Sequence, residues 1–90
     1  LNIAHPVLQG GMTGISLELS AAVSNAGGLG IFAIHNAGSP ETGREWIRRM
    51  RTLTKKPFGV NLTILPTLGA PPPYEEYARV IIEEKVQIVE

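Results

Sequence analysis

Short apolar runs recur along this chain at a regular interval. They cover residues 6–9, 29–34, 58–63 and 86–89, and each has the length of a strand. The run at 29–34 is almost unbroken, which is typical of a strand covered on both faces of a parallel sheet. We therefore predict four buried strands whose ends lie near residues 9, 33, 61 and 89.

The segments between these runs carry apolar residues at helical spacing. Ser16 can cap the first helix and Gly27 ends its pattern; its predicted inward positions are Ile15, Leu19, Ala22, Val23 and Ala26. Ser39 and Pro40 begin the second helix, and its predicted inward positions are Trp46, Ile47, Met50 and Leu53. The third begins near Tyr74, and its predicted inward positions are Tyr74, Tyr77, Ala78, Ile81 and Ile82.

Alternation of strand and helix at a spacing of about 24 to 28 residues predicts repeated βα units around a parallel sheet. A stiff segment rich in proline and glycine at 66–73 is expected on the surface. Four strands do not distinguish an open doubly wound sheet from part of a closed eight-stranded barrel. In both architectures, ligands bind where the carboxyl ends of the strands meet.

Composition narrows the possible partners. Of the 90 residues, 43% are hydrophobic, which suits a globular chain, and eight basic residues balance eight acidic ones. A neutral chain offers no general attraction to nucleic acid or to a membrane surface. Cysteine is absent, which excludes disulfides and sulfur-ligated metals within these residues. No apolar run reaches the roughly 20 residues of a membrane span, and we expect a soluble, cytoplasmic protein.

Two features at the strand ends are candidates for ligand binding. Gly10 and Gly11 follow the first strand directly, where bare backbone could rest against a planar ligand or could simply form a tight turn. Asn61 stands in an otherwise apolar strand, and a buried amide without partners costs roughly 1–3 kcal/mol. A ligand or the neighbouring backbone could satisfy it. Other polar residues at these ends are Gln9, Thr13, His35, Asn36, Thr63 and Glu90.

Three further patterns are weaker candidates. The letters G-L-G-I-F-A at 28–33 fit a dinucleotide-binding fingerprint, but they close a helix and open a strand, the reverse of what pyrophosphate binding needs. His5 and His35 lack a carboxylate or a second histidine at relay or ligand spacing, so no metal site is predicted. The arginines at 44, 48, 49 and 51 are interpreted as a solvated helix face.

Taken together, the motifs of this chain resemble those of the nitronate monooxygenases, formerly called 2-nitropropane dioxygenases. The resemblance is carried by Q-G-G-M at 9–12, L-S-A-A-V-S-N-A-G-G-L-G at 19–30 and K-P-F-G-V-N-L-T at 56–63. It continues in order through P-Y-E-E-Y at 73–77, I-I-E at 81–83 and V-Q-I-V-E at 86–90. The match runs almost from end to end.

This resemblance implies a (β/α)8 TIM barrel that binds FMN over its C-terminal face and oxidises alkyl nitronates, such as propionate 3-nitronate, with O2. It implies that Gly10, Gly11 and Met12 lie against the flavin and that Asn61 hydrogen-bonds it. Residues 1–90 would be the N-terminal part, about four βα units, of one FMN-binding barrel domain. The histidine thought to act on the substrate and the phosphate-binding loops lie later in such barrels, so no catalytic residue is assigned here.

Two positions depart from the family pattern. Residues 13–16 read T-G-I-S, without the larger side chains of some members, which leaves the substrate preference open. Lys85 stands where relatives usually have glycine at a helix end, and a left-handed conformation there costs on the order of 1 kcal/mol.

Alternative interpretations are a flavin-dependent barrel like the enoyl-acyl carrier protein reductases, a barrel like the IMP dehydrogenases, and a non-catalytic truncated fragment. The chain starts at Leu1 and stops on a strand, which suggests a fragment. Alone, four strands would leave an open parallel edge, so we expect the isolated segment to be inactive and poorly folded.

Overall fold

The computed structural model describes residues 2–12, 16–64 and 68–90. Strands and helices alternate along them, as the apolar pattern predicted. In chain order the elements are β1 (Leu8–Gln9), α1 (Leu17–Asn25), β2 (Leu29–Ala33), the 3-10 helix η1 (Ile34–Ala37), α2 (Pro40–Leu53), β3 (Phe58–Asn61) and α3 (Tyr74–Glu83).

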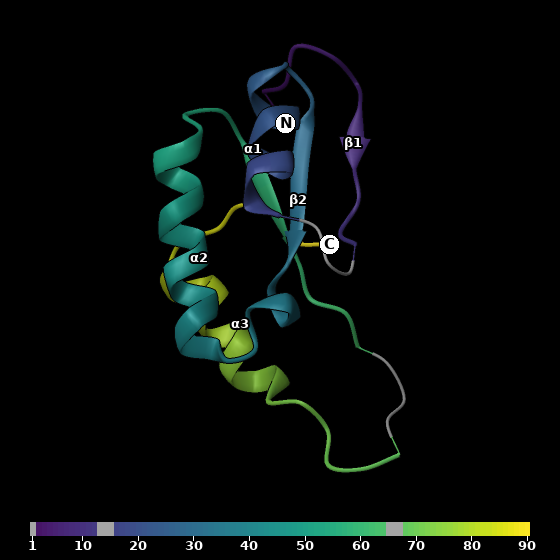
Figure 1. Cartoon of the computed structure of the whole chain (residues 1–90), viewed down its shortest axis with the longest axis vertical. Helices are drawn as coiled ribbons and strands as arrows, with labels where there is room; N and C mark the ends of the chain where they lie inside the picture. The colour runs from purple at the N-terminus through teal and green to yellow at the C-terminus, as the bar shows by residue number, and fades with distance from the viewer. Residues whose placement is uncertain (1, 13–15, 65–67) are drawn as a thin grey trace.

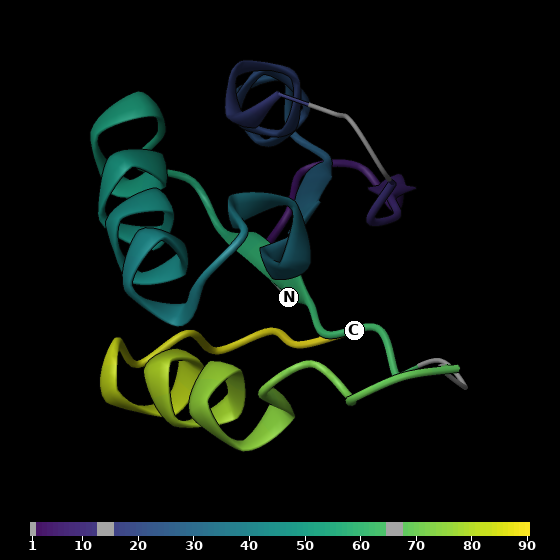
Figure 2. The same ribbon diagram turned by 60° about the horizontal axis from the view of Figure 1, so that its bottom comes forward.

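The sheet is parallel, with the strands in the order β1-β2-β3. Residues 86–90 continue this order, because Val60 and Val89 form a parallel bridge and the Val60 N–H donates to the Ile88 carbonyl at 3.0 Å. Figure 1 shows β1 and β2 running in the same direction, and Figure 2 shows the three helices in an arc outside the strands. This arrangement gathers all four carboxyl ends at one edge, called here the C-terminal edge.

The strands are shorter than the apolar runs predicted. β1 begins only at Leu8, because Pro6 has no N–H and the Val7 N–H turns back to the His5 carbonyl at 2.8 Å. β2 ends at Ala33, since Ile34 starts η1. β3 ends at Asn61, and the predicted fourth strand is a single bridge. The structure thus differs from the prediction in the lengths of the strands, and the predicted parallel pairing is confirmed.

Helix α1 lies against β2 through small residues. A Cβ on Gly30 would lie 1.8 Å from the Ser20 carbonyl oxygen, so only glycine permits this approach. The Ser20 hydroxyl donates to the Ile31 carbonyl at 3.1 Å, and the Ser24 hydroxyl accepts from the Gly30 N–H at 3.0 Å. Both serines are fully buried. Helix and strand are therefore joined by main-chain packing and hydrogen bonds.

The inward face predicted for α1 is consequently wrong. The buried residues are Leu17, Ser20, Ala21 and Ser24, whereas Leu19 and Ala22 are exposed. Ile15 lies outside the described residues. A prediction from the spacing of apolar residues misses this face, because Ser20 and Ser24 are buried. Their hydroxyls form hydrogen bonds with the strand backbone, which offsets the free-energy cost of burying them.

Gln9 ties β1 to both β2 and α1. Its side-chain oxygen accepts from the Ile31 N–H at 3.3 Å and from the Ser20 hydroxyl at 3.1 Å. Its side-chain nitrogen donates to the Ile31 carbonyl at 3.0 Å and to the carbonyl of Gly10. The first two strands are thereby held in register next to the Gly10-Gly11 step.

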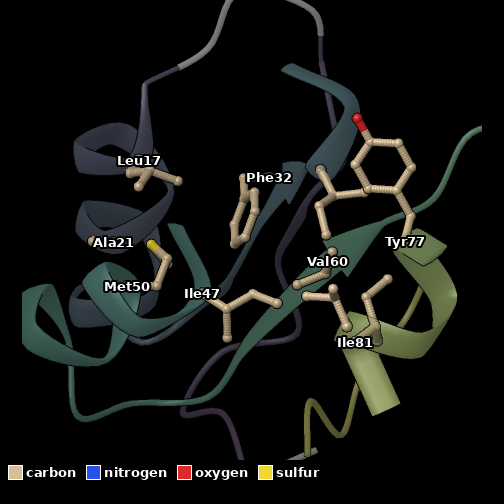
Figure 3. Close-up of a cluster of buried hydrophobic side chains, with 10 residues drawn as sticks. Leu17, Ala21, Phe32, Ile47, Met50, Val60, Tyr77 and Ile81 are labelled. Atoms are coloured by element: carbon tan, nitrogen blue, oxygen red, sulfur yellow. The ribbon is translucent and has the colours of Figure 1, made fainter. Parts of the chain in front are cut away.

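The core fills the space between the helices and the sheet. Phe32 and Val60 point from β2 and β3 toward Ile47 and Met50 of α2, as Figure 3 shows, and all four are fully buried. The predicted α2 face is confirmed. On α3 the inward residues are Tyr77, Val80 and Ile81; Ile82, predicted inward, is 74% exposed.

Lys85 ends the turn after α3 in the left-handed conformation that the sequence suggested, with φ at 58°. Its N–H donates to the Ile82 carbonyl at 3.0 Å. A side chain with a Cβ is strained here.

Replacing this lysine tests the strain. We expect Lys85→Gly to stabilise the full-length protein by up to about 1 kcal/mol, because glycine adopts positive φ without the Cβ penalty. Lys85→Ala removes the same charge but keeps the Cβ, so it should give no such gain. Urea unfolding of both variants measures the difference, and equal midpoints would contradict the assignment of strain.

The close approach at Gly30 makes a second prediction. Gly30→Ala should destabilise the protein by 1–3 kcal/mol or more, on the order of other overpacked sites, because the added methyl meets backbone that cannot rotate away. Gly69→Ala is the control, since a Cβ there meets no atom within 4 Å. Thermal unfolding of the two variants is the measurement, and a stable Gly30→Ala protein would show that α1 does not pack on β2 this closely.

Candidate functional site

The residues predicted to bind a ligand lie together at the C-terminal edge. Gly10, Gly11 and Met12 follow β1, and Asn61 is the last residue of β3. Alternation along β3 turns Asn61 away from the helices, because its neighbour Val60 points into the helix-side core. This is the face on which barrels bind their ligands.

A carboxylate at the end of residues 86–90 joins these groups. Glu90 Oε1 accepts from the Gly11 N–H at 3.0 Å and from Asn61 Nδ2 at 2.9 Å. Thr63 donates its hydroxyl to Asn61 Oδ1. The amide of Asn61 therefore has a defined orientation, with its nitrogen toward Glu90 and its oxygen toward Thr63. The partners of this amide within the chain are side chains, and not the neighbouring backbone that was the predicted alternative to a ligand.

Space requires a glycine at position 11 of this edge. A Cβ on Gly11 would lie 2.5 Å from the Asn61 Cβ, whereas one on Gly10 would make an ordinary contact, 3.4 Å from Glu90 Oε2. Bare backbone thus packs directly on the Asn61 side chain. Residues 10–12 form neither a turn nor a bend, so the tight-turn alternative has no support over these residues.

Met12 and Asn36 extend the same edge. Asn36, in η1, donates its side-chain nitrogen to the Met12 carbonyl at 2.9 Å. The Met12 side chain is 47% exposed. Thr13, a further candidate, lies outside the described residues. The strand ends of β1 and β2 are thus connected by a side chain on the ligand-binding face.

The two histidines have different surroundings. His35 lies beside the rings of Tyr74 and Tyr77, with ring centroids 5.6 and 4.7 Å away. Its Nε2 is buried and has no hydrogen-bond partner within the described part of the chain. Burial raises the pKa of the Tyr77 hydroxyl. His5 packs on Gly27 at the opposite end of the sheet, so only His35 lies near the C-terminal edge.

The arginines of α2 bind carboxylates of other helices. Glu84 receives Arg44 at 2.8 Å, Arg48 at 3.1 Å and Arg51 at 3.3 Å, and its side chain is 9% exposed. Arg49 binds Glu18 of α1 at 2.8 Å. The interpretation as a solvated face is therefore incomplete, because these cations join α2 to the end of α3 and to α1.

Hydrogen bonds from Arg48 and Arg44 lower the pKa of the Glu84 carboxyl, against the opposing effect of its burial. The hydrogen bond from Arg49 likewise lowers the pKa of Glu18. The carboxylates are thus stabilised in their charged form by the same contacts that hold the helices.

Within residues 2–12, 16–64 and 68–90, no group of three histidine, aspartate or glutamate side chains is placed to hold a metal ion. None of the helices formed by these residues has the length and apolar character needed to cross a membrane.

Known proteins share both the sequence and the fold. A family model described as nitronate monooxygenase matches residues 1–90. A nitronate monooxygenase of Pseudomonas aeruginosa is 54% identical over 63 residues, which cover 69% of this chain and 18% of that protein. The chain therefore spans less than a fifth of the length of this curated relative.

Two solved structures resemble the chain over nearly all its length. FabK from Thermotoga maritima superposes with a TM-score of 0.81 and 42% identity, covering 97% of this chain and 26% of that one. Nitroalkane oxidase from Streptomyces ansochromogenes gives 0.84 and 27%, covering 98% of this chain and 34% of that one. The predicted fold class, part of a (β/α)8 barrel, is confirmed.

The Glu84 cluster predicts a dependence of stability on pH. Because its pKa is lowered in the folded state, Glu84 contributes stability above the ordinary glutamate value of about 4.3, and this is lost as the pH falls through the lowered pKa. Glu84→Gln should lower the urea midpoint of the full-length protein at pH 7 and flatten its decline on acidification to pH 3. Glu76→Gln, on the exposed side of α3, should leave both nearly unchanged; indistinguishable profiles for the two variants would contradict this role.

Proposed function

The chain belongs to the nitronate monooxygenase family, and from this membership we propose that its protein uses FMN to oxidise alkyl nitronates with O2. Propionate 3-nitronate is the type of substrate that we propose. When bound, the flavin supplies the electron-transfer chemistry, and the protein positions and electrostatically tunes the reactants. Residues 1–90 are proposed to be the N-terminal part of one FMN-binding barrel domain.

The observation that carries the cofactor proposal is the convergence at the C-terminal edge. The Gly11 N–H and Asn61 Nδ2 both point at a single acceptor oxygen, that of Glu90. The two glycines leave backbone bare beside them. Glu90 uses the Gly11 N–H, but Asn61 Nδ2 has a second N–H and Asn61 Oδ1 has a second lone pair. Such an amide next to side-chain-free backbone suits a planar ligand edged with carbonyl oxygens and ring nitrogens, as an isoalloxazine is. The residues present therefore fit the group.

Within this proposal, each residue of the chain has a limited task. Gly10 and Gly11 give close access to the face of the ring, Met12 contributes an exposed apolar surface, and Asn61 contributes a hydrogen-bonding amide. No catalytic residue is assigned to the chain. A small nitronate and O2 are the proposed partners, while the cytoplasmic location stays a prediction.

A second candidate function is favoured by the likeness to FabK. FabK is 42% identical to this chain, against 27% for the nitroalkane oxidase, so a related flavin-dependent reductase is a genuine alternative. Reduction of the bound flavin by NAD(P)H with no response to nitronates would favour that alternative. A cysteine loop later in the natural protein would favour a barrel like IMP dehydrogenase, and an intact mass near that of 90 residues would favour a truncated product.

The decisive experiment is an absorbance spectrum of the full-length protein, recorded before and after anaerobic addition of propionate 3-nitronate. A bound-flavin spectrum that bleaches or shifts on addition, followed by recovery with O2, supports the proposal. A colourless protein that does not take up FMN on reconstitution would overturn it.

Asn61 provides a sharper test of the site. We expect Asn61→Ala to weaken FMN binding about fivefold, since one hydrogen bond to a ligand contributes on the order of 1 kcal/mol. Asn25→Ala removes an amide at the opposite end of the sheet, where it donates to the Leu53 carbonyl, and should leave FMN affinity unchanged. Quenching of FMN fluorescence measures both. Equal affinities in the two variants would remove Asn61 from the site.

A further inference from the structure

The loop 10–12 is held by side chains at each of its residues. Gln9 donates to the Gly10 carbonyl, Glu90 accepts from the Gly11 N–H at 3.0 Å, and Asn36 donates to the Met12 carbonyl at 2.9 Å. Gln9 and Asn36 also belong to the connection between β1 and β2. Glu90 alone among these three comes from the far side of the sheet, beyond β3.

One oxygen of Glu90 serves two donors from different strands. Besides the Gly11 N–H, Oε1 accepts from Asn61 Nδ2 at 2.9 Å. Hydrogen bonds to a carboxylate are stronger than those between neutral groups, so this contact orders both donors more than a neutral acceptor would. The carboxylate thus fixes the distance between the Gly11 main chain and the Asn61 amide.

The orientation of Asn61 depends on the same contact. An asparagine amide can turn by half a revolution and exchange its donor and acceptor. Thr63 binds the oxygen and Glu90 binds the nitrogen, which leaves one arrangement that satisfies both. Removing the carboxylate would leave Nδ2 without this acceptor and would free the Gly11 main chain to move.

We propose that Glu90 is a positioning residue for the flavin site: its carboxylate holds the Gly11 amide and the Asn61 side chain in the arrangement that receives the cofactor. This inference rests on the proposed function, because it concerns the same flavin edge. It assigns to Glu90 no contact with the reacting atoms. The Gly11 main chain and the remaining hydrogen-bonding positions of the Asn61 amide, placed in this way, are what the cofactor meets.

The test uses the full-length protein, with Glu90→Ala, Glu90→Gln and the control Glu75→Ala on the exposed side of α3. The first measurement is the FMN affinity of each apoprotein by fluorescence quenching. Glu90→Ala should bind FMN at least about tenfold more weakly than wild type. Glu90→Gln should stay within about threefold, because its carboxamide oxygen can accept from both donors. Glu75→Ala should match wild type.

The second measurement needs no flavin. Hydrogen–deuterium exchange of the apoproteins should show faster exchange at residues 10–12 in Glu90→Ala, near wild-type exchange there in Glu90→Gln, and unchanged exchange in α2 in both variants. Unchanged α2 exchange separates a local effect from general unfolding.

The outcomes distinguish this inference from the proposed function. Wild-type FMN affinity in Glu90→Ala would overturn the positioning role whatever its exchange, and so would equal loss of affinity in the Ala and Gln variants. If the wild-type protein itself takes up no FMN, the proposed function fails. Unchanged exchange at residues 10–12 in Glu90→Ala would show, independently of FMN, that the Glu90 carboxylate does not hold this loop.

Discussion

The contact between the backbone of α1 and the backbone of β2 at Gly30 is the constraint on which the rest of this structure depends. Because a Cβ at Gly30 would lie 1.8 Å from the Ser20 carbonyl oxygen, helix and strand meet at a distance that no other residue allows. Ser20 and Ser24 can then reach strand backbone, and Gln9 can reach Ser20. This network sets the position of β1, and with it the Gly10-Gly11 step beside Asn61. The site is therefore a consequence of how the first helix packs.

Alternate residues of the strands have different roles: one set packs against the helices, and the other set faces the ligand-binding side at the C-terminal edge. Phe32 and Val60 face the helices and build the core with α2 and α3. Asn61, one residue beyond Val60, faces the other way and meets Gly11 and Glu90. The arginine contacts with Glu84 and Glu18 hold the helices from outside. The C-terminal edge can thus carry polar groups without weakening the core.

The degree to which sequence predicted this structure varies with the kind of interaction. Helix α2 followed its apolar stripe closely, since long side chains on one face bury against the sheet with little alternative. The face of α1 was wrong because hydrogen-bonded serines and a glycine replaced apolar contacts. Gly10, Gly11, Met12 and Asn61 were predicted to gather at one edge, and they do. The hydrogen bonds of Gly11 and Asn61 with Glu90 could not be predicted, because Gly11 and Glu90 are 79 positions apart and meet only when residues 86–90 lie beside β3.

The hydrogen bonds of the Gln9 side chain determine which residues at the C-terminal edge can be substituted without moving the strands. Its side-chain amide presents a donor and an acceptor to Ile31, as a further peptide group of β1 would. The hydrogen bonding between β1 and β2 therefore continues to Ile31 through the Gln9 side chain, although the main chain of β1 has already left the sheet. The backbone from Gly10 to Met12 is released from sheet pairing and is held by side chains instead, while the alignment of β1 and β2 does not depend on it. Substitutions of the exposed Met12 can accordingly alter what is bound without shifting the strands, whereas the contact with Asn61 forbids a side chain at Gly11. In this way Gln9 separates changes in specificity from the alignment of the strands.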